Sequence, residues 1–483
     1  MTKQEAAITY IRENYLDFNR LRHDVVSDKL QVRCAHSLGD EANRLLGERQ
    51  EYWREMTKHD INSIVCHCAQ EYDANITSRE VLTALQSDLI PQIHPLREYI
   101  LSLRPYTPDQ PDWIDFVARQ VHVKNNNTKN KIQQPKQLDL TTYSARNNTA
   151  SGTEKYTYQQ LETSNKNNSL PLGCVVPQRN VVENNVVDVV VNNNPADTLW
   201  RACFKKWFVA MVASWMRNEV VNHQVLVLIG KQGIYKTTWL EHLIPPHLRA
   251  YACKLANSND LNKDERLRIA EFGLISLDEI DSMNNRELNQ LKSVITATDV
   301  NERAAYAYTK ERRVRLASFC ASGNRRDFLT DITGNRRWLP FEVESIQNPF
   351  FTTLPYEMMY AQAWALANDP TFCYWFELDE IEVLEEHNQH FRDESNEEQL
   401  LPILFDVPAE GKGEFMTTAQ ISERLVSYGN IKKPMAIGRL GVLLGQKGYR
   451  SVQRQLGGHR ARGWIVYQRD TNEIDSMKRL LAK

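Results

Sequence analysis

A glycine-rich loop stands between an apolar run and a helical pattern near the middle of the chain. The run QVLVLIG ends at Gly230 and leads into GKQGIYKTTWLEHL, which contains Gly233, Lys236 and Thr237. Glycines let main-chain N–H groups turn inward around an anion, at the start of a helix whose dipole favours negative charge. A lysine and a threonine at this spacing suit the phosphates of a nucleotide and its Mg²⁺. The spacing predicts an ATP-binding loop made of Gly230, Lys231, Gln232, Gly233, Ile234, Tyr235, Lys236, Thr237 and Thr238.

Tyr235 departs from the usual pattern of such loops, which places glycine directly before the lysine. If this position requires a positive φ, a tyrosine costs roughly 1–2 kcal/mol there. We therefore expect either a remodelled loop or a modest affinity for ATP. The alternative reading of the motif is a chance Gly-x-x-Gly turn before a helix.

Two carboxylates follow the next strand-like segment, GLISLDEID, in which the apolar run ends at Asp278 and Glu279. A carboxylate at a strand end can hold Mg²⁺ together with Thr237, and a neighbouring glutamate can polarise an attacking water. Acidic pairs after strands are common by chance. Their position downstream of a phosphate-binding loop favours a catalytic role for Asp278 and Glu279.

Two further segments carry residues of the kind that nucleotide hydrolysis uses. VRLASFCASGN predicts another buried strand that ends in Asn324, an amide able to orient water and sense the γ-phosphate. TGNRRWLPF then supplies Arg336 and Arg337, and arginine suits the charge of a transferring phosphoryl group. The alternatives are an asparagine in a turn and an arginine pair on the surface. An arginine supplied by a neighbouring subunit would require an oligomer.

A basic segment, RAAYAYTKERRVR, lies between the carboxylates and Asn324. Bases stack on aromatic rings while cations follow phosphates, so the pattern fits a hairpin that contacts single-stranded nucleic acid. A solvated basic strand explains the residues equally well. The interleaved side chains are Arg303, Tyr306, Tyr308, Lys310, Arg312, Arg313 and Arg315.

The composition divides the chain into five segments. A mostly helical N-terminal region precedes an Asn-rich stretch, which is too polar to offset its ordering entropy and is expected to be a disordered linker or insertion. The next segment opens with a helix whose three tryptophans are expected in the core, and then alternates strands and helices, which implies a parallel α/β sheet. An acidic connector, expected to form a solvated helix face, precedes a basic C-terminal module. The boundaries are 1–122, 123–196, 197–376, 377–411 and 412–483.

The C-terminal module reads as two helices and a glycine-tipped hairpin, an order that suggests a winged helix-turn-helix. Thr417 or Thr418 is expected to cap the first helix. The second helix is expected to bury Ile437, Leu440, Leu443 and Leu444. Four basic residues are expected to face nucleic acid, namely Arg439, Lys447, Arg460 and Arg462. A basic protein-binding module is the alternative.

The bulk composition is that of an ordinary globular protein, with a net charge of −2 and 42% hydrophobic residues. The eight cysteines are scattered, which suits a reducing cytoplasm and gives no zinc-site spacing. The apolar runs are strand-sized, so no association with a membrane is expected.

Together, GKQGIYKTTW, LISLDEID, ASGN and DITGNRRWLPFEV resemble the virulence-associated E family, which is related to superfamily 3 helicases and to the primase–helicases of mobile elements. The segment YDANITSREVLTALQSDLIPQIHPLREYILSLRP resembles the region that precedes the ATPase in that family. The resemblance covers roughly residues 60–122 and 197–470. It implies an AAA+-like P-loop NTPase core, ATP with Mg²⁺, a hexameric ring with arginine supplied in trans, and movement along DNA.

The expected function is therefore that of an ATP-dependent DNA helicase or translocase serving replication of a bacterial or phage mobile element. Single-stranded or duplex DNA, further copies of the chain and a separate primase or replication protein are the expected partners. No primase activity is expected, because no paired carboxylates with a histidine precede the Asn-rich stretch. The alternatives are an ATP-dependent DNA-binding switch, for example in phage defence, and an interaction protein with a degenerate loop.

Overall fold

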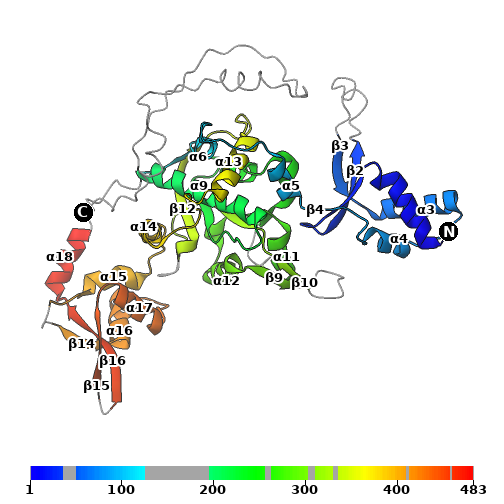
Figure 1. The fold of residues 1–483 in the computed structure, drawn as a ribbon. Helices are drawn as coiled ribbons and strands as arrows, with labels where there is room; N and C mark the ends of the chain where they lie inside the picture. The colour runs from blue at the N-terminus through cyan, green and yellow to red at the C-terminus, as the bar shows by residue number, and fades with distance from the viewer. Residues whose placement is uncertain are drawn as a thin grey trace. The chain divides into compact units, whose positions relative to one another are not determined.

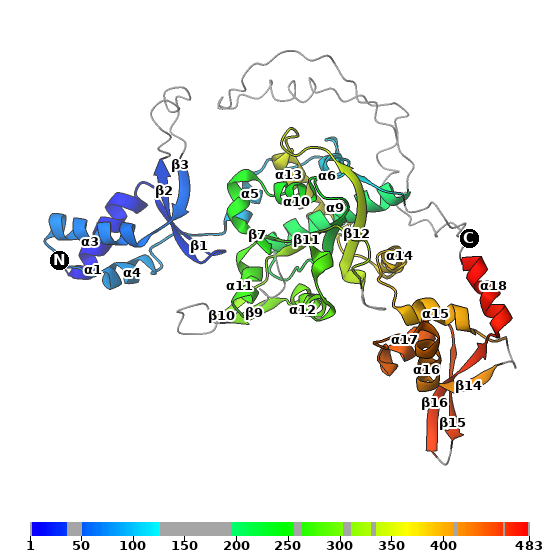
Figure 2. The same cartoon turned by 180° about the vertical axis from the view of Figure 1, so that it is seen from behind.

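The protein is described by a computed structural model, in which the chain forms two compact units (Figure 1). The first unit comprises Met1–Arg325 and Arg336–Leu384, and the second comprises Arg326–Asn335 and Glu385–Lys483. Figure 2 shows the same elements from behind. The described residues are 2–35, 51–125, 195–255, 263–302, 311–329, 335–409, 413–456 and 459–481. The Asn-rich stretch lies almost wholly outside them, so its disorder stays a prediction.

The N-terminal part of the first unit contains a four-stranded sheet beside its helices. Its elements are α1 (Lys3–Ile11), η1 (Arg12–Leu16), β1 (Leu21–Asp24), β2 (Lys29–Ala35), β3 (Glu51–Glu55), α3 (Lys58–Tyr72), α4 (Ser78–Leu85) and β4 (Gln92–Ile93). The strand order is β3-β2-β1-β4, and only β4 pairs in parallel. The described residues of this region are more often helical than extended, and the sheet is a feature that the sequence analysis did not predict. Its strands are short and interspersed with charged residues, so they give no clear alternating pattern.

Threonines fix the starts of the three helices in this region. Thr2, Thr57 and Thr77 each accept a hydrogen bond from the third residue of the helix, whose carboxylate binds the threonine N–H in return. This reciprocal capping box satisfies two main-chain donors that the helix leaves free. The helices bury a separate apolar cluster that includes Ile64 and Val81.

A six-stranded sheet forms the centre of the first unit. Its strands are β5 (Val121–Val123), β6 (Val225–Ile229), β7 (Ala252–Leu255), β8 (Leu274–Leu277), β11 (Ser318–Gly323) and β12 (Trp338–Ile346), in the order β5-β12-β6-β11-β8-β7. All pairings are parallel except that of β5 with β12. All five residues of β6 are buried, as expected for a central parallel strand. The predicted α/β sheet is thus present, with its carboxyl ends at one edge.

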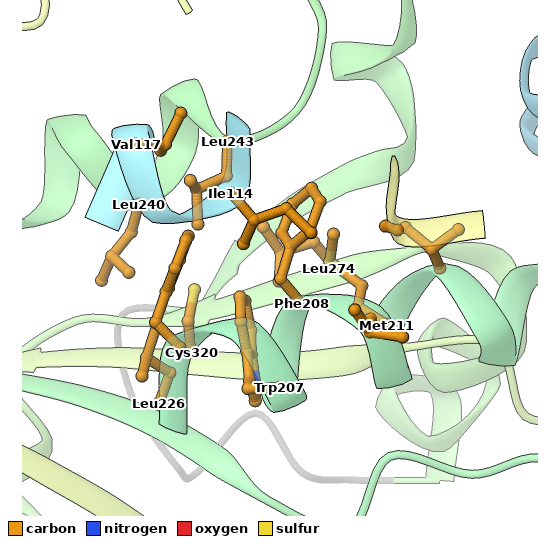
Figure 3. Packing of buried hydrophobic residues seen from close by; sticks show 14 of the residues in the cluster. Ile114, Val117, Trp207, Phe208, Met211, Leu226, Leu240, Leu243, Leu274 and Cys320 are labelled. Atoms are coloured by element: carbon orange, nitrogen blue, oxygen red, sulfur yellow. The ribbon is translucent and has the colours of Figure 1, made fainter. Parts of the chain in front are cut away.

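Helices cover this sheet and bury its apolar core (Figure 3). Those that contribute to this core include α5 (Pro95–Ser102), α6 (Trp113–Ala118), α9 (Pro195–Met216), α10 (Lys236–His242) and α13 (Tyr356–Asn368), with the short turn η2 (Pro246–Tyr251). The unit also contains α11 (Lys263–Glu271), α12 (Asn285–Thr296) and the short turn η4 (Ile280–Ser282). In α9 the expected core tryptophans Trp200, Trp207 and Trp215 are fully buried. Trp207 Nε1 donates to the carbonyl of Phe319 on β11 at 3.1 Å. The prediction of core packing for these tryptophans is confirmed.

The second unit is built around a small antiparallel sheet. Its elements include α15 (Asn396–Leu404), β13 (Phe405–Asp406), β14 (Glu414–Thr417), α16 (Thr418–Gly429), α17 (Ile437–Gln446), β15 (Arg450–Leu456), β16 (His459–Gln468) and α18 (Thr471–Leu481). β16 pairs with β13, β14 and β15. Thr417 caps α16 through a capping box with Gln420, which confirms the first alternative for that cap. Leu440, Leu443 and Leu444 are fully buried.

Two predictions for this part of the chain are corrected. Ile437 is 47% exposed, because it is the first residue of α17 and lies beyond the packed face. In the acidic connector, exposed acids do lie on α14 (Leu378–Gln389), but Glu397 and Glu398 are buried. Arg392 lies 2.8 Å from the Glu398 carboxylate, and Met435 donates its N–H to Glu397 Oε1 at 2.6 Å. These two acids therefore serve packing of the second unit.

Within the described ranges, no helix combines the length and apolar character needed to cross a membrane.

Candidate nucleotide site

The loop between β6 and α10 adopts a conformation that its residue types explain. Gly230 follows β6, and a Cβ built there would lie 2.7 Å from the carbonyl oxygen of Val343 on β12. Gly233 has a φ of +81°, a region that glycine enters without steric cost. Tyr235 directly precedes α10 with φ 66° and ψ 19°, so the position does take the left-handed conformation. The condition under which the sequence analysis assigned a conformational cost to this tyrosine is therefore met.

Lys236 lies inside this loop with only 7% of its surface exposed. Its Nζ donates to the carbonyl oxygens of Gly230 at 2.8 Å and Lys231 at 2.7 Å, and to Asn324 Oδ1 at 3.3 Å. Burial lowers the pKa of Lys236, while the nearby carboxylates oppose that change. The lysine thus joins the loop to the end of β11.

Three oxygen-bearing side chains meet next to Lys236. Thr237 Oγ1 lies 3.2 Å from Asp278 Oδ1 and 3.0 Å from Ser322 Oγ, and Ser322 donates to Asp278 Oδ1 at 2.7 Å. Burial alone would raise the pKa of Asp278, but hydrogen bonds from Lys254 and Ser322 outweigh it and the pKa is lowered. A hydroxyl beside an ionised carboxylate is the type of ligand set that Mg²⁺ prefers. Thr237 and Asp278, predicted as metal ligands, are thus brought together.

Glu279 and Asn324 complete this edge of the sheet. Glu279 follows β8, is exposed and has a φ of 52°, so like Tyr235 it takes the left-handed conformation. The Asn324 N–H donates to Asp281 Oδ1 at 3.1 Å, so the turn after β11 is held against the turn after β8. Both residues come from carboxyl ends of neighbouring parallel strands, the edge at which open α/β sheets bind ligands.

A cavity of about 300 Å³ opens among these residues. This size lies at the lower end of the range for small-molecule sites. Its lining contains Gln232, Gly233, Tyr235, Lys236, Thr237, Thr238, Asp278, Glu279, Ser322, Gly323 and Asn324. Of the other predicted loop residues, Ile234 packs against the hydrophobic core, while Gly230 and Lys231 present their carbonyls to Lys236.

Arg336 and Arg337 lie at the opposite edge of the sheet. They belong to η5 (Asn335–Arg337), directly before β12, where Trp338 pairs with Val225, the first residue of β6. The loop begins at Gly230, five residues after Val225 along β6, and this distance amounts to about 16 Å. Arg336 is exposed, and burial lowers the pKa of Arg337. The structure does not bring either arginine to the cavity of its own chain.

Sequence reasoning missed three side chains at this edge. Ser322 bridges Thr237 and Asp278, and Lys254 Nζ at the end of β7 lies 2.8 Å from Asp278 Oδ2. Arg325, which is exposed, pairs with Asp281 at 3.5 Å. Ser322 stands two residues before Asn324 in the quoted strand and could have been found from that position. Lys254 lies on a strand whose sequence gives no such signal.

The predicted hairpin has an antiparallel stem. β9 (Asp299–Glu302) pairs with β10 (Glu311–Val314), while Arg303, Tyr306, Tyr308 and Lys310 lie outside the described residues. Arg312 is exposed and pairs with Asp299 at 2.8 Å. Arg313 is engaged with Asp28 at 2.5 Å and Glu271 at 3.6 Å.

Arg315 does not belong to a basic surface, in contrast to the sequence-based reading. It is 1% exposed and donates to the carbonyls of Ala317 at 3.0 Å and Asn222 at 2.9 Å, and to carbonyls at the end of α12. Burial lowers the pKa of Arg315 to about 9. The carbonyl end of a helix carries partial negative charge, so this arginine stabilises the end of α12.

The basic residues predicted for the C-terminal module are partly exposed. Arg460 lies exposed on β16, and Arg462 on the same strand donates to Ser451 Oγ at 2.9 Å. Lys447 lies 3.5 Å from the buried Glu398, and Arg439 on α17 is half-buried. Arg460, Arg462 and Lys447 are therefore exposed, and Arg439 is the one of the four that is partly covered.

Comparison with known proteins gives one family and several solved structures. The structure "The apo structure of NrS-1 C terminal region (305-718)" is 9% identical with a TM-score of 0.41, covering 96% of this chain and 99% of that chain. "The A form apo structure of NrS-1 C terminal region-CTR" is 11% identical with a TM-score of 0.38, covering 94% of this chain and 98% of that chain. No curated protein matches the sequence. Residues 176–397, which include the cavity, match the family described as "Virulence-associated protein E-like domain".

Proposed function

We propose that the cavity binds ATP with Mg²⁺ and hydrolyses it. The observation that carries the proposal is the convergence of Lys236, Thr237, Asp278, Glu279 and Asn324 at one edge of a parallel sheet. The ammonium of Lys236 offsets phosphate charge, and Thr237 with Asp278 holds the metal. When bound, Mg²⁺ neutralises charge on the transferring phosphoryl group. Glu279 accepts the proton of the attacking water, which the Asn324 amide orients.

The core is proposed to be a P-loop NTPase of the AAA+ and superfamily 3 helicase type. Its loop follows a central strand, β6, whose neighbours are β11 and β12, and the acidic pair follows β8 on the same side as β11. Arg336 and Arg337 lie at the far edge, so a catalytic role for them requires a neighbouring subunit, as in a hexameric ring. The match to the virulence-associated protein E-like domain supports this assignment.

The enzyme is proposed to move along DNA during replication of a mobile element. In the second unit, β14, α16, α17, β15 and β16 follow one another as strand, two helices and a hairpin, the order of a winged helix. Exposed Arg460 on that hairpin suits phosphate contacts. A separate primase or replication protein is the proposed partner. A DNA-bound switch that hydrolyses ATP without unwinding is the second candidate, since such a module binds DNA in either case.

The test is an ATPase assay with and without single-stranded DNA. Wild-type protein should turn over ATP faster with the strand, and Arg312→Ala on the exposed hairpin stem should reduce that stimulation. Arg79→Ala, an exposed arginine on α4, is the matched control and should keep it. ATP hydrolysis that no nucleic acid stimulates, and no strand separation in a forked-duplex assay, would favour the switch.

Subunit sharing is tested by mixing variants. Lys236→Ala protein and Arg336→Ala/Arg337→Ala protein should each be inactive alone. A mixture should regain part of the activity, because some interfaces then join an intact loop to intact arginines. Mixed oligomers without any recovery would contradict action between subunits.

A further inference from the structure

Exposed aromatic side chains gather beside the glycine-rich loop. The segment after β12 brings Phe350 next to Tyr235, with ring centroids 6.5 Å apart and an interplanar angle of 81°. His242, at the end of α10, meets the same phenylalanine at 5.6 Å and 83°. Asn348 Nδ2 donates to the Tyr235 hydroxyl at 3.4 Å, and the Phe350 N–H donates to Asn348 Oδ1 at 3.0 Å. The loop and this segment therefore form one surface.

This surface leaves much apolar area in contact with solvent. Phe350 is 69% exposed and Tyr235 is 38% exposed. Edge-to-face contacts with two rings hold Phe350 in place, yet they cover only a small part of it. A fixed and exposed aromatic ring at the rim of a cavity is suited to stacking a planar ligand.

The backbone of Tyr235 supplies an independent indication. Its φ of 66° is a conformation that costs a side chain roughly 1–2 kcal/mol and costs glycine nothing. Such strain persists where surrounding structure enforces it, and it gathers at ligand-binding sites. Tyr235 also lines the cavity itself. The strained position thus places an aromatic ring between the phosphate-binding loop and Phe350.

The arrangement of strands indicates what this ring would contact. Asp278, Glu279 and Asn324 follow β8 and β11, all on one side of β6. The terminal phosphate must lie toward those residues if they act on it. Phe350 and Asn348 follow β12, the neighbour of β6 on the other side. A nucleotide with its terminal phosphate toward β8 and β11 thus extends its base toward Tyr235 and Phe350.

We propose that Tyr235 and Phe350 form the base-binding site for a purine nucleotide whose triphosphate lies in the glycine-rich loop. This inference rests on the proposed function and adds the recognition of the base. Asn348 is a positioning residue, because it holds the Phe350 segment in a turn and joins it to the tyrosine hydroxyl. Stacking accepts any purine ring, so ATP and GTP should both bind through this surface.

The experiment compares the binding of Mg-ATP with that of magnesium tripolyphosphate, which has the phosphates and no base. Calorimetry on the full chain gives both dissociation constants. Phe350→Ala should weaken ATP about ten-fold and leave tripolyphosphate unchanged, because stacking on an aromatic ring contributes to the base alone. Phe350 is mostly exposed, so this variant is expected to fold. Phe116→Ala is the matched control, as an exposed phenylalanine on α6 with one edge contact, to Trp113.

The outcomes separate this inference from the proposed function. Lys236→Ala should weaken both ligands. If it does, and Phe350→Ala binds ATP like the wild type, the base-binding site is refuted while the phosphate site stands. If Lys236→Ala changes neither ligand, the phosphate site itself is refuted. An equal loss of both ligands in Phe350→Ala would show a structural effect on the loop and would also refute base recognition.

Discussion

Replacing Tyr235 by alanine and by glycine should give proteins of measurably different stability. Both changes remove the ring contact with Phe350 and the hydroxyl bond to Asn348, so these losses cancel in the comparison. What remains is the Cβ atom at a φ of 66°. In the alanine variant this Cβ costs roughly 1–2 kcal/mol, and the glycine variant avoids that cost. The glycine variant in turn loses about 0.5–1 kcal/mol of stability, because an unfolded chain with glycine has more conformational freedom. The glycine variant should therefore be more stable by about 1 kcal/mol.

Urea unfolding monitored by tryptophan fluorescence measures this difference in the free energy of unfolding for the first unit of the protein. Every tryptophan except Trp464 belongs to the first unit, so the signal reports on the unit that contains the loop. Gly233→Ala is a matched control, since the φ of Gly233 is +81° and an added Cβ would meet no atom of the described residues within 4 Å. It should destabilise by about 1 kcal/mol through conformation alone. If the Tyr235→Ala variant is as stable as the Tyr235→Gly variant or more stable, the left-handed conformation of this residue is refuted.

Three further outcomes follow from other parts of the structure. Arg315→Met should lower the free energy of unfolding by about 2 kcal/mol in urea titrations, because it leaves several buried carbonyls without donors; an unchanged midpoint would contradict this role. Burial lowers the pKa of His94 to about 4, so the unfolded chain binds its proton more readily and stability falls as the pH drops from about 6.5 to 4. Between these pH values the free energy of unfolding of the His94→Asn variant should fall by about 2 kcal/mol less than that of the wild type, as measured by urea titrations at each pH. Equal falls in the two proteins would contradict the lowered pKa of His94. Arg460→Glu with Arg462→Glu should lower the slope of log affinity against log salt for duplex DNA by about 2 in fluorescence anisotropy, whereas an unchanged slope would place the duplex elsewhere.

The positions of the glycine-rich loop and of the polar residues at the carboxyl ends of the strands could be predicted because they follow local rules. Glycine spacing after an apolar run places Lys236, and polar residues at the ends of apolar runs identify Asp278 and Asn324. Parallel strands then bring those ends to one edge without further information. The buried tryptophans of α9 followed in the same way from a strongly apolar helical pattern.

What could not be predicted depends on contacts between distant segments. Arg315 stands among basic residues in the sequence, and only its contacts with carbonyls at the end of α12 show that it is buried. Lys254 lies next to Asp278 because β7 pairs with β8, and the local sequence pattern does not predict the order of the strands in the sheet. Glu398 is buried beside the nearby Arg392, and its second partner, Lys447, comes from a distant part of the sequence.

One cavity is proposed to bind ATP through Lys236 and to hydrolyse it through Glu279. The most direct measurement is ATP binding and steady-state turnover for wild type, Lys236→Ala and Glu279→Gln side by side. Lys236→Ala should weaken binding and abolish turnover, because it removes the charge that faces the phosphates. Glu279→Gln should bind ATP like the wild type and lose turnover, since an amide cannot accept the proton of the attacking water. Wild-type turnover in both variants would contradict these roles and place the reaction at another site.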